Sequence, residues 1–209
     1  GKSYFRRWNR KKANSGGLLI HKASHHFDLL NWLVGSRPAL VMAMGRLIAY
    51  GPAASSFRGK NCRSCIHSGN CPEYTNDDEN KLRQNLFYKY LDRKGYTPDL
   101  CIFDQEIDIE DQATVGIRYE NGVGVSYSLT AHSAISGQTL YVEGSRGTLE
   151  HLYHPDPVFN SKIPNTIRIH HLHGEFEEIP IPTSVGGHGG ADPLICADMF
   201  GSDRRKNHH

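Results

Sequence analysis

Three histidines and one aspartate fall within eight residues, 21–28, and these are the side chains best suited to chemistry. In a helix, successive residues turn by about 100°, which places four side chains on one face: His21, His25, Asp28 and Trp32. An imidazole titrates near neutral pH and accepts protons, and a neighbouring carboxylate can fix the tautomer of its ring. The spacing therefore predicts a helix face built for proton transfer.

The same histidines allow two other interpretations. A single helical histidine is most often a hydrogen-bonded core residue. His21 and His25, four residues apart, can also both bind zinc, although the glutamate of the HExxH motif of zinc hydrolases is missing. The adjacent stripe of the helix is expected to face the protein core and consists of His26, Leu29, Leu30 and Leu33.

The segments around this face indicate mixed secondary structure. A helix is expected over residues 18–34, because Gly35 follows as a helix-ending residue. The apolar run 39–50 predicts a buried strand, and 82–93 predicts a short amphipathic helix. Between these two elements, residues 51–80 form an irregular, cysteine-rich insertion. Long irregular loops are usually functional or clamped by something.

Three pairs of segments with alternating polarity follow, and each pair predicts an antiparallel hairpin. The pairs are 113–119 with 123–132, 139–143 with 147–151, and 166–173 with 175–181. Asn121-Gly122 is the strongest turn signal among them, and a short helix is expected over 192–200. The sequence thus predicts one α+β domain over residues 1–209, with a largely antiparallel or mixed open β-sheet and helices packed on one face.

The insertion contains Cys62, Cys65 and Cys71 in the spacing C-x2-C-x5-C. The first pair has the spacing that places two thiolates on one tetrahedral zinc ion, and Cys101 or His67 can complete the set. Free thiols and a disulfide are the alternatives. The odd total of five cysteines does not fit a secreted disulfide framework, so we expect a reduced, cytoplasmic protein.

Charge and motifs exclude several partners. The net charge of +2 is too small to indicate nucleic acid or a membrane, and no apolar run approaches the roughly 18 residues of a membrane span. The sequence contains no GxGxxG and no Walker A motif, so it lacks the usual means of holding a dinucleotide pyrophosphate. One basic cluster is expected to be a solvated segment, with phosphate binding as the alternative. It consists of Arg6, Arg7, Arg10, Lys11 and Lys12.

The helix and its flanks resemble the Gfo/Idh/MocA oxidoreductase family, at the start of the second, α/β substrate domain. The family pattern GG-x3-D-x3-H-x2-D-x3-WL-x-G is matched by Gly16, Gly17, His25, Asp28, Trp32, Leu33 and Gly35. His21 departs from the pattern, because it stands where the family has an aspartate. Residues 108–123 and 141–149 look like the family's sheet segments. The resemblance runs from about residue 14 to 200.

The resemblance implies an NAD(P)-dependent oxidoreductase that acts on a sugar, cyclitol or glycoside. Its catalytic histidine corresponds to His25, and the aspartate's role passes to His21. Residues expected around the carbohydrate-like substrate are Lys22, Asp28, His188 and Asp192. Loops similar to 186–192 line the family's substrate pocket; otherwise this segment is a flexible loop with Asp192 as N-cap. Hydride would pass from a carbinol carbon to nicotinamide C4 while a base removes the hydroxyl proton.

The resemblance also implies that NAD or NADP is bound mainly by a nucleotide domain that this chain lacks, so the isolated chain is expected to be inactive. Homo-oligomers through the open sheet face are expected on the same ground. An NAD-dependent glycosidase of the same family is one alternative function. A non-enzymatic zinc-knot module that binds a partner through its sheet is the other.

Overall fold

The computed structural model describes residues 1–78, 80–90, 96–154, 166–181 and 190–201. The chain divides into two compact units, Gly1–Ala134 and Ile135–His209, and each unit is described by itself. These compact units are not a test of domain boundaries, so one domain over residues 1–209 stays a prediction.

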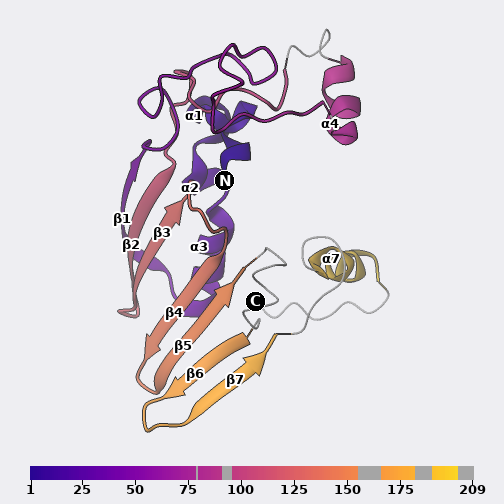
Figure 1. Cartoon of the computed structure of the whole chain (residues 1–209). Helices are drawn as coiled ribbons and strands as arrows, with labels where there is room; N and C mark the ends of the chain where they lie inside the picture. Colours follow the sequence, from indigo (N-terminus) through magenta and orange to yellow (C-terminus); the bar gives the residue numbers. More distant parts are fainter. Residues whose placement is uncertain (79, 91–95, 155–165, 182–189, 202–209) are drawn as a thin grey trace. The chain divides into compact units, whose positions relative to one another are not determined.

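The first unit contains four α-helices and a three-stranded sheet among its described residues (Figure 1). The helices are α1 (Lys12–Ser15), α2 (Leu18–His21), α3 (Ser24–Val34) and α4 (Lys81–Leu86). The strands are β1 (Pro38–Arg46), β2 (Gln112–Tyr119) and β3 (Gly124–Thr130). The sheet has the order β1-β2-β3, and both strand pairs are antiparallel.

The central strand β2 carries the core of this sheet. Val115, Ile117 and Tyr119 are buried on one face, and Phe27 and Val34 of α3 pack against them. The Tyr119 hydroxyl donates to Asn31 Oδ1 at 2.9 Å, which joins the polar side of α3 to the same strand. Alternation along β2 therefore buries every second side chain beneath the helix, as expected for a sheet covered on one face.

The predicted continuous helix over 18–34 is broken in two, and this prediction was wrong. α2 ends at His21, and α3 begins at Ser24 after the buried Ala23. The Ala23 N–H donates to the Leu18 carbonyl five residues earlier, which widens the turn and changes the phase of the helix that follows. Leu29 and Leu33 of the predicted core stripe consequently lie exposed.

The apolar run over 39–50 does form a strand, but β1 is exposed along its whole length rather than buried. It pairs only with β2, so it is an edge of the sheet. Leu40, Met42 and Met44 are each more than half exposed. An apolar run predicts a strand that something covers, and no described residue of the chain buries this one.

The basic N-terminal cluster is partly buried, contrary to its prediction as a solvated segment. Arg6 and Arg10 are 4% and 2% exposed. Arg10 donates to the Cys101 carbonyl at 2.9 Å and pairs with Asp104 at 3.2 Å and Glu106 at 2.9 Å. Buried charges persist when they are paired and hydrogen-bonded in this way, so these arginines anchor the N-terminal segment.

The second unit has a four-stranded antiparallel sheet in the order β4-β5-β6-β7. Its elements are β4 (Gln138–Gly144), β5 (Gly147–Tyr153), β6 (Thr166–His171), β7 (Phe176–Pro180) and α7 (Ala191–Phe200). All three predicted hairpins are therefore present, and the α+β fold with antiparallel strands is confirmed. Gly190, with φ 90°, is the N-cap of α7, so Asp192 lies in its first turn and not at the cap.

No helix in the described parts of the chain is both long and apolar enough to span a bilayer.

Candidate functional site

A pocket of about 420 Å³ opens beside His21 in the first unit. Small-molecule sites commonly have volumes of about 300–1,000 Å³. The N-terminal segment, α2 and the end of β3 supply its walls. The lining residues are Gly1, Ser3, Tyr4, Arg7, Trp8, Asn9, Leu18, His21, Lys22, Leu129, Thr130 and Ala131. The pocket thus combines aromatic, basic and hydroxyl side chains around one predicted site histidine.

His21 is held by two aromatic side chains. The Tyr4 hydroxyl lies 2.7 Å from His21 Nδ1, and the rings of Tyr4 and Trp8 lie 5.5 and 6.0 Å from the imidazole. Tyr4 itself is buried, so its hydroxyl is fixed. When the tyrosine donates to Nδ1, the neutral imidazole carries its proton on Nε2 and can donate a hydrogen bond to a ligand oxygen.

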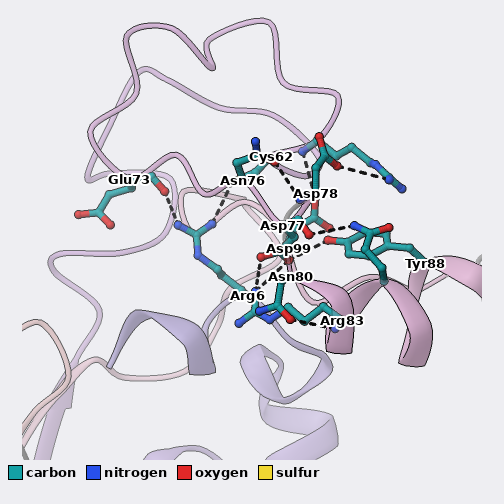
Figure 2. A network of polar contacts seen from close by, with 12 residues as sticks. Arg6, Cys62, Glu73, Asn76, Asp77, Asp78, Asn80, Arg83, Tyr88 and Asp99 are labelled. Carbon is teal, nitrogen blue, oxygen red and sulfur yellow. Dashed lines mark hydrogen bonds and ion pairs between the residues drawn. The ribbon is translucent and has the colours of Figure 1, made fainter.

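The arginines on either side of the pocket-lining residues Arg7 and Trp8 position them. Arg6 donates to Cys62 Sγ at 3.0 Å and to the Glu73 carbonyl. Figure 2 shows these contacts between Arg6 and the cysteine-rich insertion. Arg10 is held by its own ion pairs with Asp104 and Glu106, described above. The segment between these two anchors therefore presents Arg7 and Trp8 from a fixed backbone. The interleaved aromatic and basic residues over 4–10 are the sequence signal for this wall of the pocket.

The predicted catalytic stripe is divided between two places. His21 and Lys22 line the pocket, whereas His25, Asp28 and Trp32 lie exposed on α3 and do not line it. The three residues on α3 still share one face, because the helix is regular from Ser24 onward. Trp32 is 71% exposed. The break after His21 is the physical reason that one predicted face became two.

The structure does not test the glycine-histidine loop as part of the site. His188 lies outside the described residues. Asp192 lies exposed in the first turn of α7, in the second unit. The expectation that both residues contact the substrate stays a prediction.

The four candidate zinc ligands are free thiols that line one narrow cavity of about 10 Å³: Cys62, Cys65, Cys71 and Cys101. Among the described residues, no three His, Cys, Asp or Glu side chains are arranged to hold a metal ion. His67, the alternative to Cys101 as a ligand, belongs to no such group either. The described residues therefore show no group arranged to hold a metal, and the zinc site at these cysteines stays a prediction.

Polar contacts hold the cysteine-rich insertion instead (Figure 2). Asp77 accepts two hydrogen bonds from Arg83 at 2.6 and 2.8 Å and one from the Tyr88 hydroxyl at 2.9 Å. Asp99, 1% exposed, accepts from the Arg63 N–H at 3.0 Å. Burial, together with the hydrogen bond to Asp77, raises the pKa of Tyr88. A buried network of charge-assisted hydrogen bonds can order a loop without a metal.

His26 lies on the side of α3 that faces β3, and it does not line the pocket. Its Nδ1 is 2.8 Å from the Tyr127 hydroxyl, and the two rings are 5.7 Å apart. Burial lowers the pKa of His26 from its ordinary 6.5, and the charge of His25 lowers it further. The folded protein therefore favours the neutral imidazole, which costs stability in acid.

This depressed pKa predicts a pH dependence of stability. Because His26 protonates more readily in the unfolded chain, its contribution is complete above pH 6.5 and is lost as the pH falls towards the folded-state pKa. H26Q is expected to reduce this acid loss, measured as the urea midpoint at several pH values below 6.5. H132Q, at an exposed histidine, is the matched control. An unchanged acid loss in H26Q would contradict the prediction.

The family model for the oxidoreductase family (Gfo/Idh/MocA), C-terminal alpha/beta domain, matches residues 1–207. The chain belongs to the Gfo/Idh/MocA oxidoreductase family. A Bacillus subtilis (strain 168) protein named "Putative oxidoreductase YteT" is 36% identical over 217 residues, which cover 96% of this chain and 50% of that protein. The chain therefore spans half the length of this relative.

A solved structure of an oxidoreductase domain protein from Kribbella flavida matches 83% of this Gfo/Idh/MocA domain and 35% of its own chain, with a TM-score of 0.48 and 14% identity. The resemblance of the Gly16–Gly35 helix to the Gfo/Idh/MocA family is thus confirmed by the family match. The roles of the individual residues in this Gfo/Idh/MocA domain stay predictions.

Proposed function

We propose that this chain is the substrate-binding and catalytic domain of an NAD(P)-dependent oxidoreductase that acts on a sugar, cyclitol or glycoside by hydride transfer. The observation that carries the proposal is the pocket beside His21 in a domain of the Gfo/Idh/MocA family. Its volume suits a single sugar ring, and its hydroxyl, amide and imidazole groups suit a polyhydroxylated ligand. The exposed indole of Trp8 offers an apolar surface to the ring's C–H groups.

The sequence has no GxGxxG motif, the usual means of holding a dinucleotide pyrophosphate. The proposal therefore assigns cofactor binding mainly to a separate nucleotide domain. When bound, the nicotinamide supplies the hydride acceptor. This chain's own contribution is to orient the substrate and to move its hydroxyl proton.

Within the proposal, His25 is the proton acceptor. Its imidazole lies exposed on α3, with Asp28 on the same face, so this role requires the substrate to extend beyond the pocket to α3. A carboxylate near an imidazole stabilises the imidazolium that proton transfer creates. His21 and Lys22 hold substrate oxygens from the pocket. The exposed apolar side chains of β1 support a homo-oligomer formed through this sheet.

We also propose that the protein is located in the cytoplasm.

The isolated 209-residue chain is expected to show no turnover, because it lacks the cofactor cradle. The measurement compares NAD(P) reduction by this chain and by the full-length protein, with a panel of sugars and cyclitols. Circular dichroism of the isolated chain shows whether it is folded, so that inactivity is not mistaken for unfolding. Reduction of NAD(P) by the isolated chain would overturn the division of labour proposed here.

A further inference from the structure

The pocket beside His21 is basic. Its lining includes Arg7 and Lys22, and no lining residue is an aspartate or a glutamate. Both cationic side chains are exposed, so a ligand in the pocket can reach them. A pocket lined by charge of one sign attracts a ligand group of the opposite sign.

The neighbouring basic residues Arg10 and Lys11 differ from Arg7 and Lys22, because Arg10 and Lys11 form ion pairs with carboxylates. Arg10 pairs with Asp104 and Glu106, and Lys11 pairs with Glu106 at 3.0 Å. Within the described residues, Arg7 and Lys22 have no such carboxylate partner. The basic cluster thus contains cations that anchor the fold, the exposed Lys12 outside the pocket, and Arg7, which lines the pocket.

The rest of the lining suits a hydroxylated ring. Asn9 is 5% exposed, and its side-chain oxygen has no hydrogen-bond donor among the described residues. A buried acceptor without a donor is unfavourable, and a ligand hydroxyl would satisfy it if the Asn9 side chain turned towards the pocket. Leu18, Leu129 and the half-exposed indole of Trp8 supply apolar contacts.

We propose that this pocket takes a hydroxylated ring that carries an anionic group, and that Arg7 and Lys22 bind the anion. The shared chemistry is an acidic monosaccharide, with a carboxylate or a phosphate as its charge. Arginine binds either group through paired N–H donors, while lysine acts as a point charge. The inference rests on the proposed function, because it names the substrate class of the same site.

The test is calorimetric titration of the full-length protein with three ligand types in the gluco and galacto series: hexuronate, hexose phosphate and neutral hexose. At least one acidic ligand is expected to bind about tenfold or more tightly than its neutral counterpart. R7Q and K22Q are each expected to reduce this preference, because the acidic ligands lose more affinity than neutral hexose does. K12Q, at an exposed basic residue outside the pocket, is the matched control and is expected to retain the preference.

The arms of the test separate the outcomes. Tighter binding of hexuronate indicates a carboxylate, and tighter binding of hexose phosphate indicates a phosphate. Equal binding of acidic and neutral ligands, a preference that survives in both R7Q and K22Q, or no binding of any ligand overturns the inference. Cofactor reduction by the full-length protein with neutral sugars alone would overturn it as well and leave the proposed function standing. Failure of the proposed function is seen separately, as absence of NAD(P) reduction with every sugar.

Discussion

The H25N substitution is expected to lower kcat of the full-length oxidoreductase by about 10²–10⁴-fold, the usual contribution of a positioned general base. An asparagine side chain has a similar size and polarity but cannot accept the hydroxyl proton. His25 is exposed on α3 and, among the described residues, makes no hydrogen bond or ion pair. The substitution should therefore leave folding stability nearly unchanged, so that the loss of rate reports on chemistry.

Steady-state kinetics of NAD(P) reduction across a range of pH check this prediction. H25N is expected to show the lower kcat at every pH at which the wild-type protein turns over. H132N changes an exposed histidine outside the proposed site and serves as the matched control. A kcat for H25N within about twofold of wild type would exclude His25 as the base.

The D111A substitution is expected to lower the free energy of unfolding by about 3–5 kcal/mol. Asp111 is fully buried, and its carboxylate accepts backbone N–H groups from Ile48, Ala49 and Tyr50 at 2.9, 2.7 and 2.8 Å. These three donors follow β1, so the carboxylate ties the end of that strand to the start of β2. Alanine would leave all three N–H groups without their acceptor.

Urea unfolding followed by circular dichroism measures this change. D78A is the matched control, because the side chain of Asp78 is 67% exposed and its one ion pair, with Arg63, is 3.6 Å long. Its effect is expected to stay within about 0.5 kcal/mol. A loss below about 1 kcal/mol in D111A would mean that the N–H groups find other acceptors, and the account of this junction would be wrong.

Local turn chemistry made the three hairpins predictable. Asn121-Gly122 lies in a tight turn, where Gly122 has φ 87°, a conformation that glycine adopts without strain. The alternation along β2 also agrees with its burial, because Val115, Ile117 and Tyr119 are buried and the residues between them are not. These features depend on neighbours within a few residues, and a sequence contains that information directly.

Features that depend on distant partners were not predictable in the same way. Arg10 is buried because it meets carboxylates over 90 residues away, and no local pattern reports them. The exposure of β1 depends on what covers the sheet, which periodicity along one strand does not contain. The break after His21 depends on the tertiary burial of Ala23. Helical periodicity alone therefore merged the pocket and the α3 face into one stripe.

The spacing of the cysteine cluster does not by itself report the groups that lie against the thiols. Cys62 and Cys65 have the separation of a zinc-binding pair, yet the buried Cys62 accepts a hydrogen bond from Arg6. Burial raises the pKa of the Cys62 thiol, which opposes the thiolate that a metal requires. A guanidinium at this position takes the place that a cation would need.

The central claim is that this domain presents a substrate C–H bond to a nicotinamide. The most direct measurement uses the full-length protein with sugars that carry deuterium on the carbinol carbon, and mass spectrometry of the reduced cofactor. The account predicts that deuterium appears in the reduced nicotinamide and that H25N slows its appearance. Turnover of sugar without transfer of deuterium to the cofactor, or no reduced cofactor with any sugar in the panel, would contradict it.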